Sequence, residues 1–250
     1  MRFVIKIGTQ SISGKSGLNK GRIRQIVAEI AALFKLGHEV VLVSSGAIGA
    51  GLPLVQFKSP LRKKIAAAVG QPILMQSYIH EARKRRIVAG QILILSDDFT
   101  NRKHFKNFVL NMEAMLSHKI LPIINENDVM KREDLRVNDN DMLSAMVAVG
   151  LRADKLIILT NQDGLYTKNP DIDKNSELIK NVTKIDSKIK SLCFSKSDLG
   201  VGGMLAKVKA AEYATQKGVE TLIGNGERRG IMGGALRRNF YGTRFMAKKI

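Results

Sequence analysis

The sequence contains one cysteine, no tryptophan and few aromatic residues, and each shortage excludes something. The lone Cys193 cannot form an internal disulfide, and no local pattern supplies the histidine that a catalytic thiol needs. We therefore expect Cys193 to be a small, partly buried residue. Aromatic residues make up only 5% of the chain, which disfavours a stacking platform for single-stranded nucleic acid.

Long apolar runs and several well-known ligand motifs are also missing. The longest apolar runs, such as 156–159, have the length of a strand and not the roughly 20 residues of a membrane span. The first predicted strand begins almost at the N-terminus and leaves no room for a signal peptide, so we expect a cytoplasmic protein. The sequence has no P-loop and no dinucleotide-binding glycine fingerprint, and its four histidines lack metal-ligand spacing.

Positive charge is in excess, with 41 Lys and Arg against 22 Asp and Glu and a formal net charge of +19. An anionic substrate would account for part of this excess, and nucleic acid could account for more. However, the basic runs are far apart in the chain and lack interleaved aromatic residues, which is more typical of a solvated surface. We therefore do not expect a nucleic-acid partner. The runs are residues 62–64, 83–86, 228–229 and 237–238.

Hydrophobic periodicity alternates between short β-rich runs and longer amphipathic stretches. With 44% hydrophobic and 25% charged residues, this pattern is typical of a globular α/β fold with βαβ units around a largely parallel sheet. Helices are predicted near 23–36 and 102–118, around 143–147, and after Gly203. Strands are predicted at residues 3–5, 39–44, 88–95, 120–124, 155–159 and 220–223.

Boundary residues define the end of one of these helices and the course of a further helix. Gly37 is expected to end the first long helix as its C′ residue. Ser59 and Pro60 predict the cap and first position of another helix. That helix should be interrupted at Gly70-Gln71-Pro72 before a second segment continues to about residue 86.

Two lysines at opposite ends of the chain each lie beside glycine-exposed backbone. Lys6 ends a buried strand, where open α/β sheets bind their ligands. Lys207 follows Gly202 and Gly203 at the start of a predicted helix, where free N–H groups favour a phosphate. Each lysine alone could be a surface or turn residue. Together they predict an electrostatic clamp for phosphoryl transfer.

Three polar loops suit the two charged groups of an α-amino acid. The hydroxyl and bare N–H groups of residues 44–46 suit a carboxylate, whereas Asp128 and residues 139–141 suit an ammonium. The alternatives are that Asp139 and Asp141 only cap a helix and that Ser45 only meets its own backbone. A carboxylate nucleophile would need no general base, so catalysis would depend on fixed positive charge around the transferred phosphoryl group.

The combination and order of these motifs resemble the glutamate 5-kinase family of the amino acid kinase superfamily, over nearly the whole chain. The asparagine and aspartate loops are the most specific part of the resemblance. The motifs are residues 6–9, 45–48, 67–71, 124–128, 138–145 and 164–166, and residues 202–204 with Lys207.

The resemblance implies an αβα sandwich with a mostly parallel central sheet. It implies one amino acid kinase domain over residues 1–250, with an acidic-substrate lobe at 1–152 and a nucleotide-binding lobe at 153–250. The RNA-binding-like C-terminal domain of many relatives is expected to be absent. The implied reaction is ATP-dependent phosphorylation of the γ-carboxylate of L-glutamate to glutamyl 5-phosphate, the first step of proline biosynthesis. Mg²⁺, feedback inhibition by proline and homo-oligomers are further expectations.

Site residues follow from the resemblance position by position. Lys6 and Lys207 are the implied catalytic residues, and no protein metal ligand is implied. The implied substrate-binding residues are Ser45, Gly46, Asp128, Asp139, Asn140 and Asp141. The implied nucleotide-binding residues are Lys6, Gly8, Thr160, Asn161, Val201, Gly202, Gly203, Met204, Leu205, Ala206 and Lys207.

One departure and two rival functions stay open at this point. The family has Thr-Asp where this chain has Thr160-Asn161, so a carboxylate near the nucleotide is missing. One rival is another amino acid kinase that acts on aspartate, N-acetylglutamate, carbamate or a nucleoside monophosphate. Asp128 and the Asn140 loop favour a free α-ammonium and so argue against the last three, whereas the choice of glutamate over aspartate rests on the resemblance alone. The other is a nucleic-acid-binding protein on the same fold.

Overall fold

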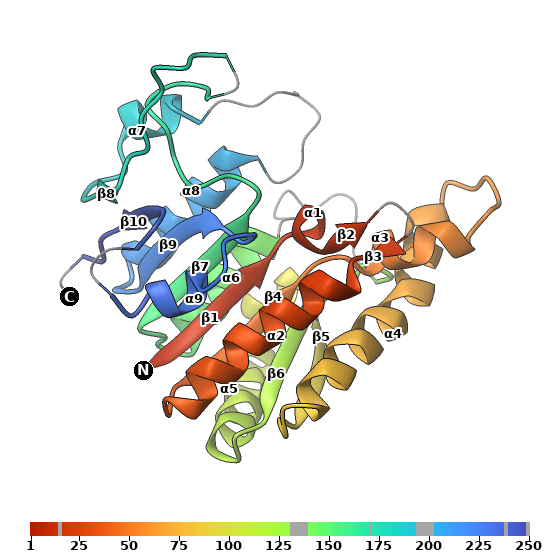
Figure 1. The fold of residues 1–250 in the computed structure, drawn as a ribbon. Coiled ribbons are helices and arrows are strands. Elements are labelled where there is room, and N and C mark those ends of the chain that lie inside the picture. Colours follow the sequence, from red (N-terminus) through yellow and green to blue (C-terminus); the bar gives the residue numbers. More distant parts are fainter. Residues whose placement is uncertain (15–16, 131–139, 171, 194–202, 238–239, 249–250) are drawn as a thin grey trace. The chain divides into compact units, whose positions relative to one another are not determined.

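The computed structural model describes residues 1–14, 17–130, 140–170, 172–193, 203–237 and 240–248. The chain divides into two compact units, one formed by Ile7–Arg136 and the other by Met1–Lys6 with Val137–Ile250. Each unit has its own strands and helices (Figure 1). The predicted lobe boundary at 152 and the function of each lobe stay predictions.

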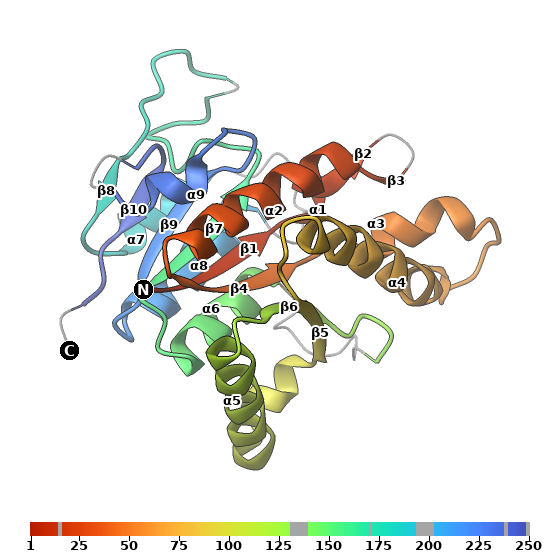
Figure 2. The ribbon, with the colours of Figure 1, turned by 60° about the horizontal axis from the view of Figure 1, so that its bottom comes forward.

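The unit of residues 7–136 is built on three parallel strands in the order β5-β6-β4. Helices α2 and α4 pack beside each other on one face of these strands, and α5 covers the other face (Figure 2). Its elements are α1 (Thr9–Ile12), β2 (Ser13–Gly14), β3 (Gly17–Leu18), α2 (Lys20–Lys35), β4 (Glu39–Ser44), α3 (Ala47–Gly51), the 3₁₀ helix η1 (Leu52–Leu54), α4 (Arg62–Arg83), β5 (Ala89–Ile94), the 3₁₀ helix η2 (Ser96–Phe99), α5 (Arg102–Ser117) and β6 (Leu121–Glu126).

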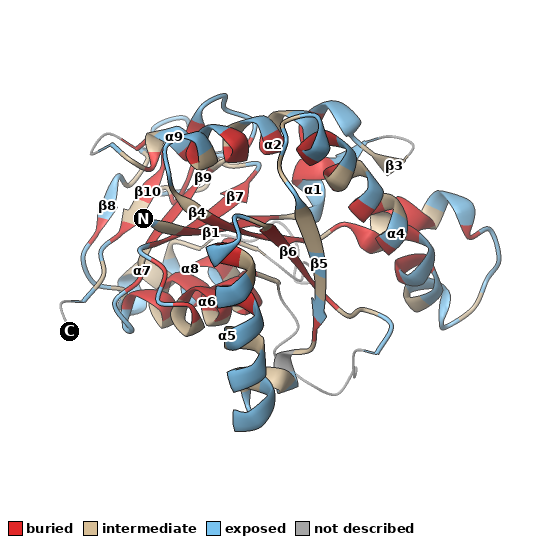
Figure 3. Cartoon of the chain, turned by 90° about the horizontal axis from the view of Figure 1, so that it is seen from below, coloured by how far each residue is buried: buried red, intermediate tan, exposed pale blue. Residues whose placement is uncertain are grey.

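The second unit orders its strands β1-β7-β9-β10-β8. Strands β7 and β9 are parallel, whereas β10 runs antiparallel to β9. Helices α6 and α8 pack together on one side of the strands, and α9 lies on the other (Figure 3). Its elements are β1 (Arg2–Ile7), α6 (Asn140–Gly150), β7 (Lys155–Thr160), β8 (Asn181–Val182), α7 (Ser187–Ser191), α8 (Met204–Thr215), β9 (Glu220–Asn225), α9 (Ile231–Gly234) and β10 (Thr243–Phe245).

Burial follows the predicted pattern of a parallel α/β core. Strands β6 and β7 are buried at every position, as expected for strands with helices on both faces. Helix α2 buries an apolar stripe and is capped by Asn19, whose side chain accepts a hydrogen bond from the Arg22 N–H at 3.0 Å. Gly37 follows the helix with φ of 77°, which confirms the predicted C′ glycine.

The predicted fold class is confirmed, because both units layer helices on two faces of mostly parallel strands. The strand and helix positions agree to within a few residues, and the strand at 39–44 agrees at both ends. Within the described residues, no helix is both long and apolar enough to cross a bilayer.

Helix α4 contradicts two predictions. It begins at Arg62 and not after Ser59, because Ser59 instead accepts a hydrogen bond from the Leu61 N–H and closes a turn. The helix also continues through Gly70, Gln71 and Pro72 without interruption. Backbone packing explains the continuity: a Cβ at Gly70 would lie 1.9 Å from the Ala47 carbonyl oxygen, so the helix touches α3 backbone to backbone.

Candidate functional site

The two predicted lysines converge on one buried carboxylate. The Lys6 ammonium lies 2.5 Å from one oxygen of Asp141, and the Lys207 ammonium lies 2.9 Å from the other. Lys6 comes from the end of β1, Asp141 from the first turn of α6 and Lys207 from the first turns of α8. The fold thus joins positions that are 66 residues apart or more.

Burial makes this trio electrostatically unusual. Asp141 is fully buried, and Lys6 and Lys207 are 4% and 7% exposed. Burial by itself would raise the pKa of Asp141, but the two ammonium groups outweigh that effect and hold the pKa below its usual value. Two cations against one anion leave the trio with a net positive charge. Such a group can attract the anionic oxygens of a transferred phosphoryl group.

Asp141 therefore has a geometry that the sequence did not reveal. It was predicted beside the substrate ammonium or as a helix cap, whereas its carboxylate contacts Lys6 and Lys207. Its position in the first turn of α6 is also favourable for a negative charge. Asn140 begins the same helix, and Asp139 lies outside the described residues.

Gly203 forms the N-cap of α8, with extended backbone, and the predicted nucleotide segment continues into the first turn. Met204 and Lys207 are buried there, and Leu205 is exposed. Ala206 donates its N–H to the Gly203 carbonyl at 3.1 Å. Val201 and Gly202 lie outside the described residues.

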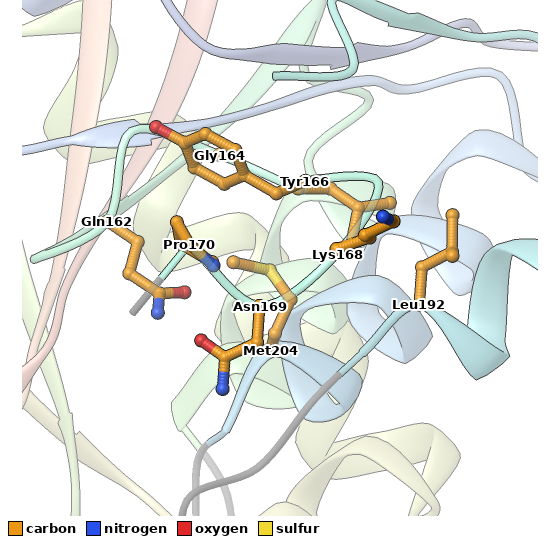
Figure 4. Close-up of a pocket in the computed structure, with 9 residues that line it drawn as sticks. Gln162, Gly164, Tyr166, Lys168, Asn169, Pro170, Leu192 and Met204 are labelled. Carbon is orange, nitrogen blue, oxygen red and sulfur yellow. The ribbon is translucent and has the colours of Figure 1, made fainter. Parts of the chain in front are cut away.

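A small hollow, partly open to solvent, lies beside this helix start. Figure 4 shows the side chains of Met204, Pro170 and Asn169 gathered around it. Of the predicted nucleotide residues that the structure describes, only Met204 lines the hollow. Thr160 and Asn161 directly precede the lining residue Gln162 in the chain. The Thr160 hydroxyl donates a hydrogen bond to the Asn161 side-chain oxygen at 3.2 Å. The lining residues are Gln162, Gly164, Leu165, Tyr166, Lys168, Asn169, Pro170, Leu192 and Met204.

An ion pair that was not predicted holds the loop which forms part of this wall. Arg228 donates to both oxygens of Asp163, at 3.0 and 3.1 Å, and its guanidinium stacks 3.4 Å from the centre of the Tyr241 ring. The hydrogen bonds with Arg228 lower the pKa of Asp163 more than its partial burial raises it. The sequence signal at this position is the run of two arginines at 228–229, which was predicted to be solvated surface and not part of an ion pair.

In the other unit, the predicted carboxylate loop follows β4. Gly46 has φ of 113°, and a Cβ there would lie 2.7 Å from the Ile12 side chain, so the turn requires glycine. The Ser44 hydroxyl lies 2.9 Å from the Tyr78 hydroxyl and donates to the Ser45 carbonyl at 2.9 Å. This buried bond network fixes the backbone of the loop.

The predicted ammonium loop follows β6 in the same unit. Asp128 is half-buried, and its N–H donates to the Glu126 carbonyl at 3.0 Å. Because β4 and β6 are adjacent and parallel, Ser45 and Asp128 follow strand ends at the same edge. Gly8 caps the short helix α1 and accepts from the Ser11 N–H at 3.0 Å.

Comparison with known proteins gives consistent results. A sequence model of the amino acid kinase family matches residues 1–225. The chain is 42% identical to a glutamate 5-kinase of Clostridium acetobutylicum, over 99% of this chain and 95% of that protein. It is 40% identical to a glutamate 5-kinase of Streptococcus sanguinis, over 89% of this chain and only 62% of that longer protein.

Solved structures show the same fold at lower identity. An X-ray structure of isopentenyl phosphate kinase superposes with a TM-score of 0.67 at 16% identity, and covers 98% of this chain. The product complex of T. acidophilum isopentenyl phosphate kinase gives 0.66 at the same identity. These likenesses concern the fold alone.

Proposed function

The chain belongs to the amino acid kinase family, and from this premise we propose that it transfers the γ-phosphoryl group of ATP to the γ-carboxylate of L-glutamate. The substrate follows from relatives named glutamate 5-kinase at 40–42% identity. The observation that carries the chemistry is the convergence of Lys6 and Lys207 on Asp141. The resemblance found in the sequence motifs agrees with this substrate and with this chemistry.

The reaction needs charge stabilisation more than proton transfer. The glutamate γ-carboxylate is ionised at neutral pH, so its oxygen can attack the γ-phosphorus directly. The new O–P bond forms while the bond to the β-phosphate oxygen breaks, and ADP leaves. Lys6 and Lys207 stabilise the negative charge on the transferred group, and Asp141 serves the site by fixing both ammonium groups.

Glutamate recognition is proposed for the polar loops that the sequence singled out. The hydroxyl of Ser45 and the backbone at Gly46 would bind a carboxylate, and Asp128, Asp139 and Asn140 would bind the α-ammonium. The support from the structure is that Ser45 and Asp128 follow the carboxyl ends of adjacent parallel strands.

ATP is proposed to bind at the start of α8 and in the hollow beside it. Helix N-termini favour phosphate, and the hollow beside this one is lined by both apolar and polar side chains. Gly8, Thr160, Asn161 and the segment 201–207 complete the proposed nucleotide site. Asn161 stands where the family has an aspartate, so its amide replaces one negative charge.

Mg²⁺ is proposed to enter with ATP. Among the described residues, no cluster of three or more His, Cys, Asp or Glu side chains could hold a metal ion. Mg²⁺ that binds with a nucleotide is usually held by the phosphates and keeps several waters. When bound there, Mg²⁺ would neutralise phosphate charge. Proline inhibition and homo-oligomers are proposed from the resemblance alone. A cytoplasmic location is proposed as well.

A hydroxamate assay tests the function. Purified protein with glutamate, ATP, Mg²⁺ and hydroxylamine should yield glutamyl hydroxamate, because hydroxylamine traps the acyl phosphate. Lys6→Ala and Lys207→Ala should each lower kcat by about 10²–10³, as removal of one preorganised charge donor does. Lys209→Ala is the matched control, since Lys209 is an exposed residue of the same helix.

Parallel reactions with aspartate and N-acetylglutamate test the choice of substrate. No hydroxamate from glutamate, with product from one of the other acids, would contradict the proposal. Full activity of both lysine variants would contradict the proposed chemistry.

A further inference from the structure

A buried carboxamide in the unit of residues 7–136 uses only part of its hydrogen-bonding capacity. Gln71 lies in the middle of α4 and is 8% exposed. Its Oε1 accepts a hydrogen bond from the Asn125 Nδ2 at 2.8 Å. Its Nε2 has no hydrogen-bond partner among the residues that the structure describes. Buried donors are nearly always satisfied in folded proteins, so this exception points to an acceptor that binds there.

Gln71 lies beside the two loops of its own unit that are proposed to bind the acid substrate. On one side it contacts Asn125, which belongs to the end of β6 and precedes Asp128. On the other side its neighbour Gly70 touches α3, which begins directly after the Ser45-Gly46 turn. One turn along α4, the side chain of Leu74 lies 3.9 Å from the position of a Cβ at Gly46.

The strand register supports the same placement. Strands β4 and β6 are parallel neighbours, with Val43 opposite Ile124. The next residues along each strand, Ser44 and Asn125, are therefore at the same level of the sheet edge. Gln71 thus lies over the carboxyl ends of two adjacent parallel strands, which is where α/β folds bind ligands.

We propose that Gln71 is a substrate-binding residue whose Nε2 donates a hydrogen bond to a carboxylate oxygen of the bound acid. The inference rests on the proposed function for the identity of that acid. An amide nitrogen is a donor only, so it suits a carboxylate and repels the α-ammonium. Asn125 has the supporting role, because its hydrogen bond to Oε1 sets the plane of the Gln71 amide.

Two substitutions separate this role from a purely structural one. Gln71→Glu keeps an oxygen that can accept from Asn125 but replaces the donor with an anion. Gln71→Met keeps the length of the side chain and removes both the hydrogen-bond donor and the acceptor. Gln76→Met, at an exposed position of the same helix, is the matched control.

The KM for glutamate should rise by about ten- to a hundred-fold in Gln71→Met, the usual effect of losing a hydrogen bond to a charged group. Gln71→Glu should raise it at least as much, because its carboxylate repels that of the substrate. The KM for ATP should stay close to that of the wild type, as should all values for Gln76→Met. The melting temperature without ligands should fall in Gln71→Met, because the buried Asn125 amide loses its hydrogen bond to Oε1, so the test is the difference between the two KM values.

If Gln71 only supported Asn125, Gln71→Glu would keep the wild-type KM for glutamate, and this result overturns the inference. An equal rise in the KM for ATP also overturns it. Failure of the proposed function looks different: the wild type itself would turn over another acid and not glutamate. In that case the KM of the Gln71 variants for the acid that is turned over, compared with the KM of the wild type, would still decide the role of Gln71.

Discussion

Asp141 shows most clearly what depends on a single residue. It is a fully buried anion that contacts two largely buried cations, so its removal leaves two ammonium groups close together without the carboxylate they share. Breaking a buried ion pair by removing one partner typically costs about 3–5 kcal/mol. We expect Asp141→Asn to lower the free energy of unfolding in urea by that amount at pH 7.

The pH dependence of this loss has a definite sign. The pKa of Asp141 is lower in the folded protein, so its stabilisation is present above the ordinary carboxyl pKa of about 3.9 and disappears as the pH falls through the folded value. The difference between variant and wild type should therefore shrink below about pH 4. Asp173→Asn, which breaks the exposed pair with Lys168, should change little at any pH. An unchanged stability of Asp141→Asn at pH 7 would contradict the argument.

Cys193 offers a second test at the residue scale. Burial raises the pKa of its thiol to about 11, and the prediction of a partly buried cysteine is confirmed. Because only the thiolate reacts, alkylation by iodoacetamide at pH 8 should be at least about a hundred-fold slower than for an ordinary thiol. The rate should rise about tenfold per pH unit up to pH 11. The urea-unfolded chain is the control, and a plateau of the native rate near pH 9 would contradict this prediction.

Site residues could be predicted where a residue and its neighbours in the sequence form a recognisable pattern. Lys6 could be found because it ends an apolar strand, and Lys207 because it follows two glycines. The partner of both lysines could not be found in this way, because Asp141 is 66 residues from Lys207 and even further from Lys6. The order of the strands in the sheet decides which charged residues meet across such a separation in sequence. Local sequence patterns carry no information about that order.

At the scale of elements, α4 shows the limit of local helix rules. Gly70 and Pro72 together predicted a break, yet the helix continues through both, and Gly70 serves close packing on Ala47 and not a helix end. Pro72 is exposed and still lacks a backbone N–H. We expect Pro72→Ala to raise the free energy of unfolding by about 1–3 kcal/mol, since proline inside a helix costs up to about that much. Gln76→Ala is the control, and a less stable Pro72→Ala protein would show that the proline is required.

The loop of residues 161–166 gives a second prediction at this scale. Arg228 ties it to the segment after β9 through Asp163, and Tyr241 covers the guanidinium. Arg228→Ala should raise the KM for ATP by roughly three- to ten-fold, because the loop lines the proposed nucleotide hollow and the ion pair is only partly buried. Arg228→Lys should recover only part of the affinity, since lysine cannot bind both oxygens in parallel.

Arg229→Ala is the matched control for this series, because Arg229 is an exposed neighbour. The KM for glutamate should be the same in all of these variants. A fall in kcat with an unchanged KM for ATP would show that Arg228 does not act through the nucleotide pocket.

At the scale of the whole molecule, the fold class was predictable because it needs only the alternation of strand and helix periods. The αβα layering, the parallel strands and most element positions follow from that alternation. The antiparallel strand β10, with only three residues, was not predicted. Its pairing with β9 comes from tertiary packing of a short segment without a strong pattern of its own.

The net charge of +19 is a property of the whole chain, and it should make stability depend on salt. Like charges on a compact protein repel one another, and salt screens this repulsion over a Debye length that falls from about 30 Å at 0.01 M to about 8 Å at 0.15 M. We expect the melting temperature at pH 7 to rise by several degrees when KCl increases over that range.

The same titration near the isoelectric point is the control for this charge effect. At about pH 10.1 the net charge vanishes, so the rise with KCl should largely disappear. If the melting temperature rises equally at both pH values, salt acts through something other than net repulsion, such as binding of chloride. If it falls with salt at pH 7, local ion pairs such as those of Lys155 and Arg244 with Glu220 outweigh the long-range repulsion.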